Sequence, residues 1–153
     1  MKFILLFLVT TFSFSVNAQT KNEKYLHTLP IGYKLTDSNN EEGKRCEKDI
    51  DGDSKKDLIV QLFNEYGDGI IVIYLSSTFE KSKTYQWFDW IFSSNYLDIN
   101  CGEKIEILGS MESMGIFQKL TLAYSTTQKK MIVKSYKDSL GEVSFKIYSG
   151  TIK

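Results

Sequence analysis

The chain has 153 residues, of which 42% are hydrophobic, 14% aromatic and 25% charged, with a single proline. This composition excludes a disordered chain, and the length favours one globular domain over two. The 19 basic and 19 acidic side chains give a formal net charge of zero. The overall charge therefore gives no reason to expect binding to nucleic acid or to an anionic membrane surface.

The N-terminal segment, residues 1–18, has the pattern of a secretory signal peptide. Lys2 provides a short basic start, residues 3–9 are apolar, and residues 16–18 are Val-Asn-Ala, a small-x-small pattern that signal peptidase recognises. A membrane anchor is the alternative, but the apolar run is well short of the roughly 20 residues that cross a bilayer. We expect a signal peptide over 1–18 and a single β-rich domain over 19–153, secreted or periplasmic and without a membrane span.

Along the rest of the chain, apolar residues recur at every second position, which predicts strands rather than helices. Weak strand candidates lie around Tyr33 and Cys46. Residues 58–63 and 70–75 are apolar on both faces and flank a turn-forming stretch, which predicts a central hairpin. Five further segments are expected to be strands: 85–92, 105–107, 120–124, 131–136 and 143–147.

Helices are expected to be almost absent, with at most one turn in residues 76–83 and another in 109–115. Successive strands with short connections pair antiparallel as a meander. The sequence therefore predicts an all-β fold, an antiparallel meander that is either propeller-like or sandwich-like.

Cys46 and Cys101 are the two cysteines, and both follow the expected cleavage point. An exported chain with two thiols usually oxidises them, so we expect a Cys46–Cys101 disulfide that restricts the unfolded chain by roughly 4 kcal/mol. Two buried free thiols are the alternative. A zinc site does not fit, because two cysteines and one histidine, widely separated, supply neither the number nor the spacing of ligands.

Residues 49–57, here called the Asp loop, read Asp-Ile-Asp-Gly-Asp-Ser-Lys-Lys-Asp and lead directly into the first strand of the hairpin. The carboxylates of Asp49, Asp51, Asp53 and Asp57 can converge on one point, and the carbonyl oxygen of Lys55 can close the ring. Without an ion these carboxylates would repel one another. The pattern predicts a calcium site with these five ligands, and a solvated Asp-Gly turn without metal is the alternative.

Residues 49–60 resemble the calcium loop and following strand of FG-GAP and VCBS repeats, which implies calcium binding by the same four aspartates. An EF-hand does not fit, because Ser54 and Val60 replace its glycine and glutamate. One copy in a chain of this length is too little for an ordinary propeller. The layout also resembles small exported bacterial proteins, some similar to periplasmic lysozyme inhibitors and immunity proteins, which implies a binding or inhibitory function.

Catalytic residues are not expected. The only histidine, His27, lies near the start of the expected mature chain, and the sequence has neither a phosphate-binding glycine loop nor a nucleophile elbow. In residues 85–92, Phe88, Trp90 and Phe92 are expected in the core, whereas Tyr85 and Trp87 are candidates for ligand contact.

We therefore expect a non-catalytic, calcium-binding module of the cell envelope that binds or inhibits a protein partner. Two alternatives stay open: a glycan-binding module that uses Tyr85 and Trp87, and an uncharacterised envelope hydrolase.

Overall fold

The computed structural model describes residue 25 and residues 29–90, 92, 94–139 and 146–152. The expected signal peptide, His27 and residues 143–145 of an expected strand lie outside the described residues.

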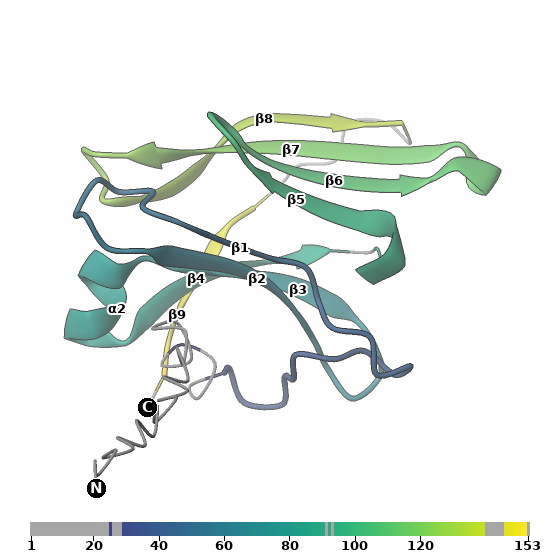
Figure 1. Ribbon diagram of the computed structural model, residues 1–153, viewed down its shortest axis with the longest axis horizontal. Helices are drawn as coiled ribbons and strands as arrows, with labels where there is room; N and C mark the ends of the chain where they lie inside the picture. Colours follow the sequence, from purple (N-terminus) through teal and green to yellow (C-terminus); the bar gives the residue numbers. More distant parts are fainter. Residues whose placement is uncertain (1–24, 26–28, 91, 93, 140–145, 153) are drawn as a thin grey trace, which may run out of the picture.

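Two antiparallel sheets face each other (Figure 1). The first sheet has the order β1-β2-β3-β4-β9, and the second has the order β5-β6-β7-β8. The strands of the first sheet are β1 (Arg45–Lys48), β2 (Asp57–Phe63), β3 (Gly69–Tyr74), β4 (Thr84–Trp90) and β9 (Tyr148–Thr151). Those of the second sheet are β5 (Leu97–Cys101), β6 (Ile105–Met111), β7 (Ile116–Ser125) and β8 (Lys130–Asp138).

The predicted all-β class and antiparallel meander are confirmed. Of the two expected layouts, propeller-like and sandwich-like, the two facing sheets match the sandwich-like one. The expected hairpin corresponds to β2 and β3, which pair from Leu58 with Tyr74 to Phe63 with Gly69. Two strands were not predicted, β5 and β9. Of the strand expected at 143–147, residues 146 and 147 precede β9 instead of belonging to it.

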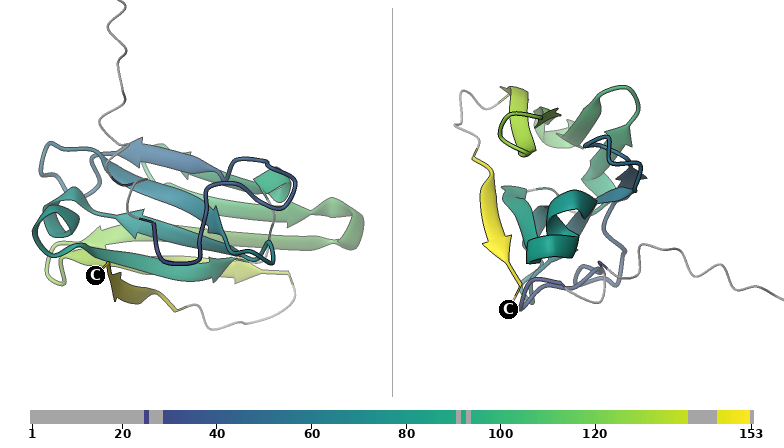
Figure 2. Two further views of the ribbon diagram at one scale, coloured as in Figure 1. Left: turned by 90° about the horizontal axis from the view of Figure 1, so that it is seen from below. Right: turned by 90° about the vertical axis from the view of Figure 1, so that its left-hand side faces the viewer.

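The helical segments are short: α2 (Ser76–Ser82), η1 (Ser94–Tyr96) and η2 (Glu112–Met114). With seven residues, α2 is longer than the single turn predicted there. It ends at Lys83, whose left-handed backbone (φ 55°) lets its N–H donate to the carbonyl of Phe79. The end of the sandwich that carries α2 faces the viewer in the right-hand panel of Figure 2.

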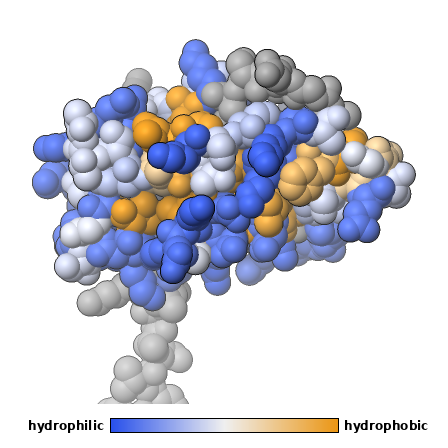
Figure 3. Space-filling view, turned by 90° about the horizontal axis from the view of Figure 1, so that it is seen from above, coloured by the Kyte–Doolittle hydropathy of each residue, from blue (hydrophilic) through white to orange (hydrophobic). Residues whose placement is uncertain are grey.

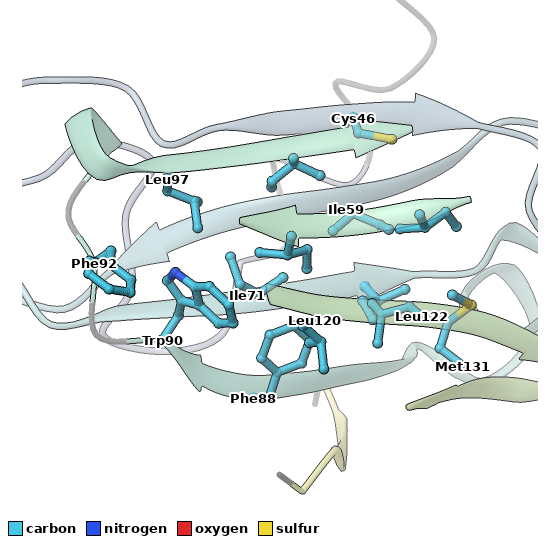
Figure 4. Packing of buried hydrophobic residues seen from close by; sticks show 14 of the residues in the cluster. Cys46, Ile59, Ile71, Phe88, Trp90, Phe92, Leu97, Leu120, Leu122 and Met131 are labelled. Carbon is cyan, nitrogen blue, oxygen red and sulfur yellow. The ribbon is translucent and has the colours of Figure 1, made fainter. Parts of the chain in front are cut away.

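The main core lies between the sheets (Figure 4). Alternate residues of β3, β4, β5, β6 and β7 point into it, as the period-two pattern requires. It contains Ile59, Ile71, Phe88, Trp90 and Phe92 on one side and Leu97, Ile107, Leu120, Leu122 and Met131 on the other. Burying each of the larger side chains contributes about 1.5–3 kcal/mol. The predicted core positions of Phe88, Trp90 and Phe92 are therefore confirmed.

A second apolar cluster covers the outer face of the first sheet. Tyr25 is fully buried there, with its ring centroid 5.5 Å from that of Tyr74 and 5.3 Å from that of Phe79 in α2. Every residue of β2 is buried, because the sheet is covered on both sides. This explains why β2 and β3 are apolar on both faces.

The disulfide between Cys46 and Cys101 is confirmed. Cys46 lies in β1 and Cys101 in β5, so the bond joins edge strands of the two sheets across 6.2 Å between Cα atoms. Next to it, the ammonium group of Lys48 donates a hydrogen bond to the carbonyl of Gly102. The strand that precedes the Asp loop is thereby attached to the second sheet.

The side chain of Gln86 in β4 connects the sheets through Met131 in β8. Its Nε2 donates to the carbonyl oxygen of Met131 at 3.0 Å, and its Oε1 accepts the Met131 N–H at 2.7 Å. Both residues are buried. Met131 lies on the edge strand β8, which pairs with β7 alone among the described strands. Gln86 thus provides hydrogen-bond partners for both backbone groups of this core residue.

Replacing Gln86 by leucine is expected to destabilise the protein by about 3 kcal/mol, because it leaves the N–H and carbonyl of Met131 buried without partners. Denaturant unfolding of the wild type and Gln86→Leu measures this difference. Gln128→Leu, a matched change at an exposed position, is expected to change stability by less than about 0.5 kcal/mol. Equal midpoints for Gln86→Leu and the wild type would contradict the bridging role.

Candidate metal centre and the adjoining hollows

The Asp loop connects β1 to β2 at the end of the sandwich that also carries α2 (Figure 1). Two of its residues have positive φ angles, Gly52 at 81° and Ser54 at 65°. Glycine adopts this region readily, whereas serine does so at some cost. The left-handed residues fold the loop tightly, so that its carboxylates turn back toward its own backbone.

Asp57, the first residue of β2, is fully buried. Its Oδ2 accepts the N–H groups of Ile50 at 2.7 Å and Asp51 at 3.3 Å, and its Oδ1 accepts the N–H of Ser76 at 2.7 Å. Burial raises the pKa of Asp57, the hydrogen bonds from Ser76 and Ile50 oppose this change, and the charge of Asp51 adds to it. A buried carboxylate in such surroundings is stabilised by a nearby cation.

The other loop carboxylates are also hydrogen bonded. Asp49 accepts the N–H groups of Gly52 at 2.8 Å and Ser54 at 3.0 Å. Asp51 accepts the N–H of Asp53 at 3.1 Å and the hydroxyl of Ser77. These contacts orient both side chains before any ion binds.

Three of the predicted ligands come together in the structure. One carboxylate oxygen from each of Asp49, Asp51 and Asp57 lies within 4.8 Å of the other two. Oxygens at this spacing can surround one hard cation, since calcium–oxygen bonds measure about 2.3–2.6 Å. The structure thus contains a group of carboxylates that could hold a metal ion, and its donor set suits a hard cation.

The two remaining predicted ligands have other partners. Asp53 accepts the N–H of Lys55 at 2.9 Å and the hydroxyl of Ser76 at 2.8 Å, and it does not belong to the three-oxygen group. The ammonium group of Lys55 pairs with Glu80 at 2.5 Å. Ligation by Asp53 and by the Lys55 carbonyl stays a prediction.

Sequence reasoning missed the role of α2 in this site. Ser76 and Ser77, at its start, contact Asp57, Asp53 and Asp51. They follow the Asp loop by some 20 residues, and nothing in their local pattern indicates contact with the loop. Only the packing of α2 brings these two serines to the loop.

Two hollows adjoin the Asp loop. The larger, of about 790 Å³, extends from Asp49 and Asp51 across β6, β7 and β8. The smaller, of about 470 Å³, lies between the loop, α2 and the β7–β8 turn. Tyr124 of β7 lines both, and its pKa is raised by burial and by the charges of Asp51, Asp57 and Asp53. The loop is therefore reachable from the surface on two sides.

The candidate contact residues Tyr85 and Trp87 lie elsewhere, on the outer face of the first sheet. Trp87 stacks on Tyr148 of β9 with ring centroids 4.7 Å apart, and Tyr85 lies 6.0 Å from Tyr74. Both are half-buried. Tyr148 is 37% exposed, and the ammonium group of Lys146 lies 5.0 Å from its ring centroid. Of these rings, that of Tyr148 is the most exposed.

No protein-family model matches the chain, and no significant match was found among characterised proteins or solved structures. In the described part of the chain, no helix has the length and apolarity needed to cross a bilayer. The fold and the site geometry are therefore the basis for a functional proposal.

Proposed function

We propose that this protein is an exported, calcium-stabilised β-domain that acts by binding a protein of the cell envelope. The main observation in support of a calcium site is the group of three carboxylates, one of them fully buried, with oxygens within 4.8 Å of one another. Calcium suits this group better than magnesium, because calcium accepts a larger and less regular set of protein oxygens.

The ion would have a structural role. Two of its three candidate ligands, Asp49 and Asp51, lie in the connection between β1 and β2. The third, Asp57, begins β2 and also accepts a hydrogen bond from the start of α2. A cation there would offset the repulsion among the carboxylates and hold the loop against the helix. The disulfide supports the export part of the proposal, because such bonds persist mainly in oxidising compartments.

A binding role agrees with the surface next to the loop. Hollows to which many polar and charged residues contribute adjoin it on two sides, and the loop connections at this end extend from a disulfide-linked sandwich. Binding residues are often carried by loops that a rigid scaffold positions. Inhibitory or immunity-type proteins act by such contacts alone, without a reaction of their own.

The proposal is tested by affinity capture from an envelope extract with the immobilised mature protein, in calcium and in chelator. We expect one protein to be retained in calcium, and less of it in chelator. The captured protein should then lose activity, or be protected, when the purified domain is added. Turnover of a cell-wall substrate by the domain itself would contradict the proposal and favour an envelope hydrolase.

Glycan binding is the second candidate, favoured by the stacked Trp87–Tyr148 pair and the partial exposure of Tyr148. Retention on an immobilised envelope polysaccharide, release by free sugar and loss of retention in Tyr148→Ala would support it over protein binding.

A further inference from the structure

The larger hollow, here called the groove, is lined by the end of β1, the Asp loop, the β5–β6 turn and parts of β6, β7 and β8. Its volume of about 790 Å³ lies in the range of ligand sites. Figure 3 shows the molecule from the side of the second sheet, where hydrophobic patches lie among hydrophilic residues.

The cationic part of the lining consists of five lysines, Lys48, Lys104, Lys119, Lys134 and Lys137. Lys119 pairs with Glu106 at 2.9 Å, and Lys48 donates to the Gly102 carbonyl. Lys134 and Lys137, both on the edge strand β8, are exposed, and neither forms an ion pair with another described residue. Their charges are available to a ligand.

The acidic part of the lining has four members: Asp49, Asp51, Glu103 and Glu106. Without an ion, the charges of the lining nearly cancel, and the end at the Asp loop is negative. A divalent cation bound by Asp49 and Asp51 would offset their charges, so that the five lysines would face only the two glutamates. Binding of the ion would therefore change the groove from nearly neutral to cationic.

We propose that the calcium-loaded groove binds an acidic peptide segment of the protein partner. Part of this inference rests on the proposed calcium site, because the ion removes the negative charge from one end of the groove. Electrostatic complementarity would place carboxylates of the segment at Lys134 and Lys137. Thr121, at the floor, and Ser135 of β8 add polar groups to the lining.

An acidic peptide fits this lining better than an acidic glycan. Sugar rings are usually recognised by flat aromatic surfaces, and Tyr124 is the only aromatic residue among the described groove residues. The stacked Trp87–Tyr148 pair belongs to the other sheet. Charge and hydrogen bonding, rather than stacking, would therefore select the ligand.

The test is calorimetric titration of the mature protein with a capped ten-residue peptide of alternating Glu and Ser, and with the same peptide carrying Gln in place of Glu. We expect the Glu peptide to bind in calcium, more weakly in chelator and more weakly as salt increases. The Gln peptide is expected not to bind. Lys134→Gln with Lys137→Gln should weaken binding of the Glu peptide about tenfold. The matched control is Lys34→Gln with Lys44→Gln, two exposed lysines outside the groove lining, and should bind as the wild type does.

A further variant separates the groove from the calcium site. Asp49→Asn with Asp51→Asn removes the two charges that the ion would offset, so it should bind the Glu peptide even in chelator. If this variant binds the Glu peptide while calcium has no effect on the wild type, the proposed calcium site is wrong and the groove proposal is retained. The groove proposal is overturned if the Lys134→Gln, Lys137→Gln protein binds as the wild type does, or if the Gln peptide binds equally. Tighter binding of an oligogalacturonate than of the Glu peptide would overturn the choice of a peptide.

Discussion

Calcium at about 100 times its dissociation constant is expected to stabilise the metal-free protein by about 2.7 kcal/mol. For a domain of this size the gain corresponds to an increase in melting temperature of about 8 °C. The physical reason is the group formed by Asp49, Asp51 and Asp57, whose oxygens lie within 4.8 Å of one another only when the loop is folded. Thermal unfolding of the chelated protein with added calcium, magnesium or neither measures the effect, and the largest shift is expected with calcium.

The aspartates differ in their expected contribution. Asp49→Asn with Asp51→Asn should abolish the calcium response, because two of the three clustered carboxylates are lost. Asp53→Asn is the matched control and should keep most of the response, since the Asp53 carboxylate accepts hydrogen bonds from Lys55 and Ser76 outside that group. Equal loss in both proteins would show that Asp53 is a ligand, as its position in the sequence predicts. An unchanged response in the double variant would place the ion elsewhere.

Removal of the disulfide by Cys46→Ala with Cys101→Ala is expected to destabilise the protein by roughly 4 kcal/mol. The two cysteines are separated by 55 positions in the chain, so the bond removes much conformational freedom from the unfolded state. It also joins β1 to β5, edge strands of different sheets.

Chemical denaturation of the double variant and of the oxidised wild type measures the change. The wild type in reductant should match the double variant, which serves as the control for side effects of the substitutions. If the native protein contains two thiols that react with a labelling reagent before unfolding, the bond does not form in solution and the expected loss disappears.

Local sequence patterns were sufficient for several features of the fold. Alternation predicts β6 and β7, because successive residues of a strand point to opposite faces whatever lies beyond them. The continuous apolar pattern of β2 and β3 predicts strands buried on both sides, and the structure confirms this. The pairing of Cys46 with Cys101 needed no geometry, since no other cysteine exists.

The geometry of the Asp loop is only partly predicted by the local sequence pattern. Its spacing alone indicates four converging aspartates, but the structure groups three of them and turns Asp53 toward Ser76. That difference comes from α2. The sequence of this seven-residue helix gives no indication that it packs beside the loop. The strand β5 was missed for a related reason, because only its pairing with β6 distinguishes its five residues from a connection.

Alternation of apolar residues, cysteine content and the spacing of aspartates can be read directly from the amino-acid sequence. They were enough to predict an all-β chain with one disulfide and the Asp loop. Contacts between distant segments are not encoded in such local patterns. The burial of Tyr25 against Tyr74, the bridge from Gln86 to Met131 and the lysine-lined groove beside the Asp loop arise from the packing of the sheets. They depend on which strands become neighbours, and this is decided by the free energy of the whole folded chain.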